Sequence, residues 1–170
     1  MTPISYIEII GLKYPDISLR SNGTSELYND LIILSGGPLP DQLTLDVLIL
    51  QEHKNRGWKL IQAERDRRRA GGILINGYWF HTDDTSRIQY LGLVLMGQNL
   101  PAGIMWKTMS GTFIEMTPTL AVQIFQGIAS KDTSIFTVAE QHKTALNASS
   151  TPMTYEYLTG SPSWPTIYGE

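Results

Sequence analysis

Residues 71–98 constrain the fold of this chain more than any other stretch, because they encode a β-hairpin that leads directly into a helix. Two β-forming runs, 73–75 and 78–80, are joined by Asn76-Gly77, the dipeptide that favours a two-residue type I′ turn. Capping residues follow at 82–85, ahead of three apolar residues at helical spacing: Ile88, Leu91 and Leu95. The segment therefore predicts a strand–turn–strand–helix unit.

A second hairpin and helix follow in the same order. The runs 104–108 and 112–116 flank a three-residue loop that ends on Gly111, and Thr117-Pro118 then begin a helix with an apolar stripe. Because a single hairpin buries too little surface to persist, we expect a small antiparallel sheet with helices packed on one face. The predicted fold class is α+β, with small antiparallel β-hairpins in a ββα-ββα arrangement.

Four segments are predicted along the chain. Residues 1–40 form a helix–strand region, 41–70 a long connecting helix, 71–148 the ββα-ββα domain and 149–170 an extended aromatic tail. The length of 170 residues corresponds to about one domain, so a split into two independent domains is not expected.

The first two segments carry more detailed predictions. Thr2-Pro3 is expected to begin a short helix, and a strand within 27–34 is expected to pair with residues 17–19 across the turn-rich stretch 20–25. The segment 41–70 reads either as one helix with a solvated middle or as two helices hinged near Gly57. Its length suggests self-association.

Composition excludes several classes of function. The chain has no cysteine, which removes disulfides, thiolate metal sites and a cysteine nucleophile. A net charge of -3 disfavours a general nucleic-acid binder, and no apolar run approaches the ~18 residues that span a bilayer. Glycine-rich phosphate-binding motifs and hydrolase motifs do not occur. We therefore expect no cofactor, no nucleic-acid partner and no membrane partner.

The best candidate for chemistry is the stretch 81–84, where His81, Asp83 and Asp84 supply an imidazole and two carboxylates. One hypothesis is a metal-dependent or catalytic site at His81 and Asp83, but no sequence motif indicates a third ligand. Capping explains Thr82, Asp83 and Asp84 without a metal, because side-chain oxygens there bond the first free N–H groups of the next helix. We favour capping, and expect no metal site and no enzymatic activity.

The only dense charge run is 64–69, which ends the long helix with four arginines. A solvated helix end is the simplest reading, because cations there complement the helix dipole and Gly71 or Gly72 supplies the left-handed cap. A phosphate-binding patch and a protein interface are the alternatives. For the interface, the candidate residues are Arg65, Arg68 and Arg69.

The tail 149–170 is too aromatic for a simple spacer. Its aromatic candidates for a protein interface are Tyr155, Tyr157, Trp164 and Tyr168. They either wrap the chain's own surface or anchor a partner, since tyrosine and tryptophan are favoured interface residues.

A set of turn glycines, caps, aromatic strand residues and arginines is also similar to a known pattern. The set comprises Trp58, Arg65-Asp66-Arg67-Arg68, Gly71-Gly72, residues 77–83 and 86–90, Pro101, Trp106-Lys107-Thr108, Gly111, Phe113, Thr117 and His142. Across about residues 56–147 it resembles an uncharacterised domain family of tailed bacteriophages and prophages, whose members accompany tail-fibre and tail-assembly proteins. That family has no established catalytic residues to transfer.

The resemblance implies a function in the virion. It suggests a non-enzymatic structural or adaptor component of a phage tail, in the tail-fibre or baseplate–fibre region, that is assembled in the host cytoplasm. The implied partner is a tail-fibre or baseplate protein, bound by a homo-oligomer or by several copies on a trimeric fibre. A tail-fibre assembly chaperone, which binds the fibre only while it folds, is the alternative.

Overall fold

A computed structural model describes residues 1–22 and 27–170, and these form two compact units. The first unit comprises Met1–Leu60 and Lys143–Glu156, and the second comprises Ile61–His142 and Tyr157–Glu170. Two long helices contribute residues to both units: α2, Gln42–Ala70, and α4, Pro118–Ala148. We expected about one domain made of four segments, with the ββα-ββα segment at 71–148, whereas in the structure the end of α2 and most of the tail join the ββα-ββα elements.

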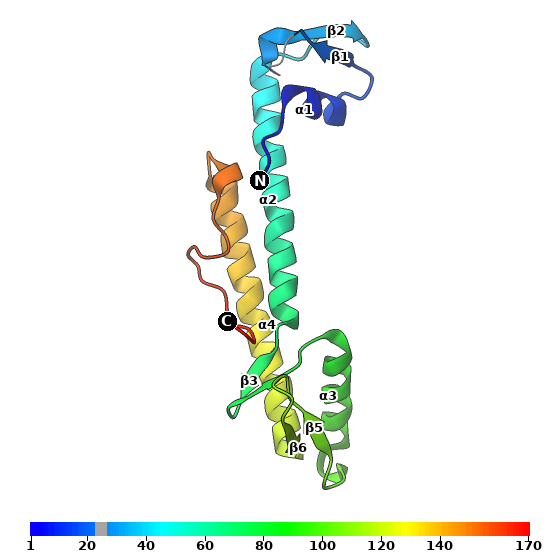
Figure 1. The fold of residues 1–170 in the computed structure, drawn as a ribbon, viewed down its shortest axis with the longest axis vertical. Coiled ribbons are helices and arrows are strands. Elements are labelled where there is room, and N and C mark those ends of the chain that lie inside the picture. Colours follow the sequence, from blue (N-terminus) through cyan, green and yellow to red (C-terminus); the bar gives the residue numbers. More distant parts are fainter. Residues whose placement is uncertain (23–26) are drawn as a thin grey trace. The chain divides into compact units, whose positions relative to one another are not determined.

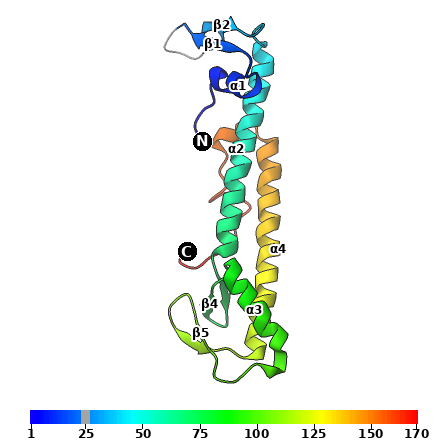
Figure 2. The same cartoon turned by 90° about the vertical axis from the view of Figure 1, so that its right-hand side faces the viewer.

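The first unit holds a helix and a hairpin against the beginning of α2 (Figure 2). Its elements are α1, Tyr6–Lys13, β1, Ser18–Ser21, η1, Tyr28–Asp30, β2, Leu31–Ser35, and η3, Pro152–Thr154. The strands β1 and β2 pair antiparallel, which confirms the predicted strand pairing. Their core contains Ile4, Ile9, Ile10 and Leu45. Of the predicted turn at 20–25, residues 20 and 21 belong to β1, and residues 23–25 lie outside the described residues.

The beginning of α1 differs from the prediction. Ser5, not Thr2, is the N-cap, and its side-chain oxygen accepts from the N–H of Glu8 at 3.2 Å. Ile4 is buried in the core just before the helix, so the chain before Ser5 is held by packing rather than by helical hydrogen bonds.

α2 is one continuous helix through Gly57, as the first of the two alternatives for residues 41–70 predicted, but its middle is not solvated throughout, because His53 and Gly57 are buried. A Cβ atom at Gly57 would lie 2.9 Å from the Leu146 side chain of α4, so glycine here allows close helix packing. Gly57 therefore serves as a contact point, and no hinge forms there.

The second unit has the predicted ββα-ββα order (Figure 1). Its elements are β3, Ile73–Ile75, β4, Tyr78–Phe80, α3, Asp84–Met96, η2, Gly97–Asn99, β5, Met105–Lys107, and β6, Phe113–Glu115, followed by α4. Asn76 and Gly77 both have positive φ, 51° and 84°, as a type I′ turn requires. The α+β class with small antiparallel hairpins is confirmed.

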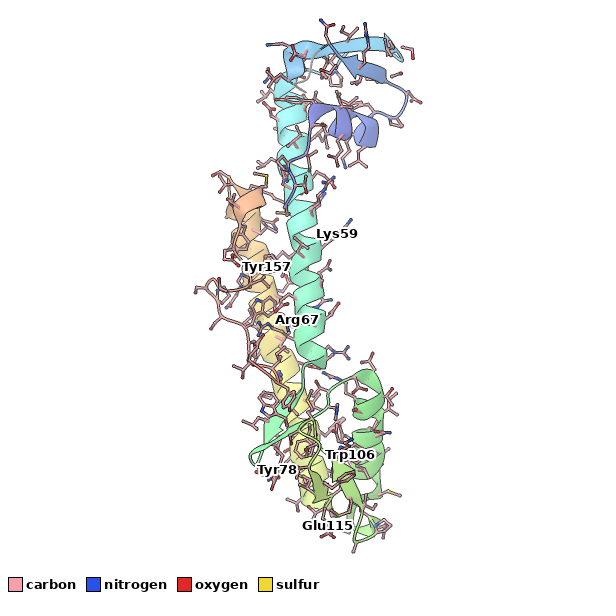
Figure 3. All side chains as sticks on the ribbon, in the orientation of Figure 1. Lys59, Arg67, Tyr78, Trp106, Glu115 and Tyr157 are labelled. Carbon is pink, nitrogen blue, oxygen red and sulfur yellow. The ribbon has the colours of Figure 1, made fainter. Side chains whose placement is uncertain are left out.

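The two hairpins do not merge into the single small sheet that we expected. Each remains a two-stranded sheet, and one backbone bond links them, from the Met109 N–H to the Trp79 carbonyl oxygen at 2.8 Å. Side-chain packing replaces the missing ladder. Trp106 lies between its hairpin and α3, with its ring centroid 5.0 Å from that of the fully buried Tyr90 (Figure 3).

Candidate functional site

The arginine-rich end of α2 is packed against the C-terminal tail of the chain. Arg68 is only 7% exposed and donates to Glu64 at 2.5 Å, to the Pro165 carbonyl at 2.9 Å and to Glu170 at 2.9 Å. Arg67 donates to both carboxylate oxygens of Glu64, at 2.7 and 2.8 Å. These bonds, with that of Arg67 the stronger, hold the pKa of Glu64 below its usual value. This cluster ties the tail to α2.

A second cluster joins α2, α3 and α4. Arg87 donates in bidentate fashion to Asp132, at 2.5 and 2.9 Å, and also to the carbonyl oxygens of Thr82 and Arg69, at 2.5 and 2.9 Å. The Arg69 side chain lies 3.2 Å from Asp84 and 3.7 Å from Asp132. Bidentate arginine–carboxylate pairs are among the strongest polar contacts, so this cluster fixes the beginning of α3 on α4.

These contacts show how accessible each of the three predicted interface arginines is. The Arg68 guanidinium is buried and bonded within the chain. Arg65 donates to Asp66 at 2.8 Å and stacks over the Phe136 ring at 5.1 Å, and Arg69 keeps only part of its side chain exposed. The three arginines are neighbours along α2, but they do not form one open cationic surface.

The tail aromatics divide in the same way. Trp164 is 7% exposed, stacks on His142 at 5.3 Å and donates to the Tyr157 carbonyl at 2.6 Å, so it packs on its own chain and not on a partner. Tyr155 and Tyr157 are half-buried, in the first and second units respectively. Tyr168 is exposed and meets Trp79 edge-on at 5.9 Å. Of the four, Tyr168 remains the most available for contact.

Within the stretch 81–84, capping accounts for Asp83. Asp83 is the N-cap of α3 and accepts from the N–H and the hydroxyl of Ser86 at 3.0 and 2.7 Å, which lowers the Asp83 pKa. Thr82 does not cap the helix as predicted. Its hydroxyl is buried, accepts from the Gly72 N–H and donates to the Arg69 carbonyl. Among residues 1–22 and 27–170, no three histidine, aspartate or glutamate side chains gather around a possible metal position.

One residue of this region carried no sequence signal. The Lys131 ammonium donates to the Gly72 carbonyl oxygen and lies 5.8 Å from the centre of the Trp79 ring. Burial lowers the pKa of Lys131 to about 8. Its position on α4 makes it a further tie between this helix and the first hairpin.

The second unit exposes one apolar face of α3, and the exposure of this face was not predicted from the sequence. The helix was predicted from Ile88, Leu91 and Leu95, yet these residues face outward: Ile88 is 71% and Leu95 is 77% exposed. Tyr90 points to the core instead, with Leu93 and Val94 packed beside it. Together with Gly92 and Met96, the exposed residues form a stripe that we call the α3 face.

The α3 face has the spacing of a helix-binding surface. Its five residues fall at i, i+3, i+4, i+7 and i+8, the pattern of a side that normally packs against another element. A Cβ atom at Gly92 would meet no atom within 4 Å, so the centre of the face is open. No described residue of the chain covers it.

Comparison with known proteins adds a family assignment. A family model described as a domain of unknown function, DUF4376, matches residues 52–159. The chain belongs to the DUF4376 family. No curated protein and no solved structure matches it. The DUF4376 span includes the α3 face, the Arg87 cluster, all of α4 and most of α2, and it ends before Pro165 and Glu170 of the Arg68 cluster. Within the described residues, no helix of this DUF4376 protein is long and apolar enough to cross a membrane.

We predict that acidification destabilises this DUF4376 protein in a window set by two histidines. Burial lowers the pKa values of His53 and His142 below 6.5, so the unfolded chain binds more protons below that pH. Stability is therefore complete above about pH 7 and falls as the pH drops, by up to about 1.4 kcal/mol per pH unit for each histidine. Urea unfolding between about pH 7.5 and about pH 5.5, with imidazole NMR titrations, checks this. Stability that rises on acidification through this window would contradict it.

Proposed function

We propose that this chain is a non-enzymatic structural or adaptor component of a bacteriophage tail, in the tail-fibre or baseplate–fibre region. It works by protein–protein contact, with a fibre or baseplate protein as its partner. The observation that carries the contact role is the α3 face, an open apolar helix surface on a well-packed unit. The phage assignment rests on the sequence resemblance over about residues 56–147.

Exposed apolar side chains are common singly, but a continuous stripe on one helix is unusual for a monomer. Three exposed apolar side chains, those of Ile88, Leu91 and Leu95, lie on one side of two turns of α3. Burying this stripe against a partner helix or sheet would remove it from water, which is the main driving force of association. The α3 face therefore suits an adaptor that holds a second protein.

The polar residues support a structural role. Asp83 caps a helix, Glu64 and Arg68 tie the tail to α2, and Arg87 locks α3 to α4. Each of these groups has a role in holding elements together. Because phage fibres are commonly trimers, a protein that binds them through one such face would be present in several copies.

The α3 face predicts the effect of two charge substitutions. Ile88→Asp and Leu95→Asp should leave the melting temperature nearly unchanged, because both side chains are exposed, and should lower the amount of this protein in purified virions at least tenfold. Quantitative mass spectrometry of virions from the phage that encodes the chain measures the effect. Gln89→Asp is the matched control, since Gln89 is exposed on the same helix but lies off the apolar stripe.

Each outcome of this test bears on the proposal. If the unsubstituted chain is absent from virions, the structural role is wrong. If the neighbouring fibre protein then also loses solubility without this chain, a tail-fibre assembly chaperone is the function. Incorporation that survives both aspartate substitutions would remove the α3 face from the mechanism.

A further inference from the structure

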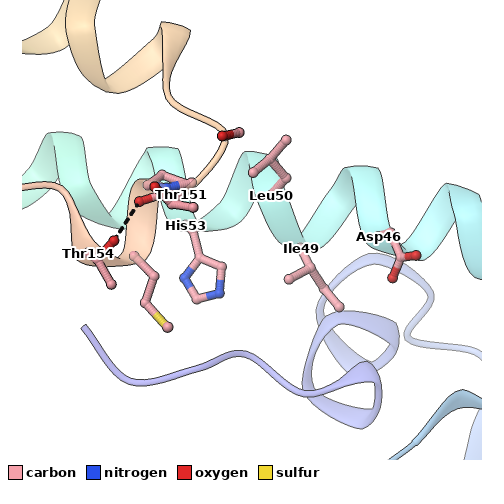
Figure 4. Close-up of a pocket in the computed structure, with 9 residues that line it drawn as sticks. Asp46, Ile49, Leu50, His53, Thr151 and Thr154 are labelled. Atoms are coloured by element: carbon pink, nitrogen blue, oxygen red, sulfur yellow. Dashed lines mark hydrogen bonds between the residues drawn. The ribbon is translucent and has the colours of Figure 1, made fainter.

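A pocket in the first unit is separate from the α3 face and from both arginine clusters. Its volume is about 350 Å³, and it lies between α2 and the turn that contains η3 (Figure 4). The pocket is lined by Asp46, Ile49, Leu50, His53, Ser150, Thr151, Pro152, Met153 and Thr154. That volume falls at the lower end of the range for small-molecule sites.

The walls of the pocket are mostly apolar. Ile49 and Leu50 contribute from α2, and Pro152 and Met153 from the opposite side. Among the described residues of the lining, Asp46 is the one carboxylate, and it already accepts a hydrogen bond from the Tyr6 hydroxyl at 2.6 Å. None of the described residues that line the pocket is a lysine or arginine, so a negatively charged ligand would find no counter-ion among them.

One polar atom in this lining lacks a partner. His53 is 8% exposed, and its Nδ1 atom makes no hydrogen bond with any described residue. Buried polar atoms in folded proteins nearly always have a partner, either protein, water or ligand. His53 lies beside Thr151 in Figure 4, and its imidazole is part of the pocket lining.

The protonation state of His53 limits which chemical groups of a ligand can bond to its imidazole. Burial, together with the nearby Arg56 guanidinium, lowers the His53 pKa, so the imidazole is neutral near pH 7. A neutral imidazole has one N–H donor and one acceptor nitrogen, and the tautomer decides which of them is Nδ1. A hydroxyl group suits both tautomers because it can donate or accept.

We infer that this pocket binds a compact, uncharged, mostly apolar molecule that carries one hydroxyl group, with the hydroxyl bonded to His53 Nδ1. The apolar body of the ligand packs on Ile49, Leu50 and Met153. Phenols and small cyclic alcohols are the chemical class that combines these features. This site goes beyond the proposed function and does not depend on it.

Three probes of one shape test the inference on the full chain. Para-ethylphenol should bind and shift the NMR signals of residues 150–154, and ethylbenzene, which lacks the hydroxyl, should bind roughly tenfold more weakly. Para-ethylbenzoate, which is negatively charged, should not bind. Absence of phenol binding at millimolar concentration, equal affinity for phenol and hydrocarbon, or preferential benzoate binding would each overturn the inference.

A substitution isolates the role of His53. In His53→Leu the phenol and the hydrocarbon should bind with equal affinity, because the hydrogen bond is lost while the apolar walls remain. The matched control is His81→Leu, in the second unit, which should keep the tenfold preference for the phenol over the hydrocarbon. A preference retained in His53→Leu would show that the hydroxyl bonds elsewhere. If His53→Leu does not fold, the probe series on the unsubstituted chain still decides the matter.

Discussion

Arg68→Met is expected to lower the free energy of unfolding of the second unit by about 2–4 kcal/mol, because it removes one of the two arginine partners of the buried Glu64 carboxylate and leaves only Arg67. Methionine keeps much of the apolar contact with the Trp164 ring, which Arg68 covers at 5.7 Å, so the loss reports on charge and hydrogen bonding. The bonds to Pro165 and Glu170 also disappear, so the tail should become accessible to proteases. Urea unfolding and limited proteolysis measure both effects.

Arg65→Met is the matched control on the same helix. Arg65 pairs with the exposed Asp66, and such surface pairs contribute about 0–1 kcal/mol. The comparison also separates two roles for Arg68. If Arg68→Met leaves stability unchanged but weakens binding to a fibre protein, Arg68 is an interface residue after all and the internal cluster is unimportant.

Gly36→Ala should destabilise the first unit by about 3–5 kcal/mol, because a Cβ atom there meets both backbone strain and a backbone clash. Gly36 has φ of 97°, and its Cβ would overlap the Asp16 carbonyl oxygen and lie 2.8 Å from the Ile17 Cα. Neither atom is the end of a flexible side chain, so the β1–β2 hairpin has to move. Thermal unfolding and amide hydrogen exchange in β1 and β2 report the change.

The adjacent Gly37 provides the control. Its φ is 112°, but a Cβ atom there would meet nothing within 4 Å. Gly37→Ala should therefore cost only the conformational strain, about 1–2 kcal/mol. Equal losses for the two substitutions would mean that the approach of Gly36 to Asp16 has no energetic weight.

The elements of the fold were predictable where local chemistry determines the backbone. Asn76-Gly77 specifies its turn because few other dipeptides accept positive φ twice, and Asp83 identifies the beginning of α3 because its side chain caps the helix. The separation of the two hairpins was not predictable, because strand pairing between distant segments depends on packing that no local pattern encodes. For the same reason, the packing of the tail into the second unit was not predictable from the sequence.

The surfaces were less predictable than the elements. Periodicity identified α3 as a helix, but it has two apolar sides, and only the folded structure shows that Tyr90 is buried while Ile88 is exposed. Glu64 could have been recognised as a partner of Arg67 and Arg68 from its i, i+3 and i, i+4 spacing. Glu170 could not, because it lies 102 residues from Arg68 along the chain. The His53 pocket was equally hidden, since its far wall is a turn without periodicity.

The composition of the two units from discontinuous segments limits how the chain can acquire its structure. Met1–Leu60 form one unit with Lys143–Glu156, and the ββα-ββα elements form the other unit together with Tyr157–Glu170. During synthesis, therefore, neither unit is complete when its first segment leaves the ribosome, and long-range closure has to wait for the later segments. A fragment that ends at residue 142 would contain every strand of the described residues and yet lack the last segment of each unit, with the buried side chains of Leu146, Trp164 and Ile167.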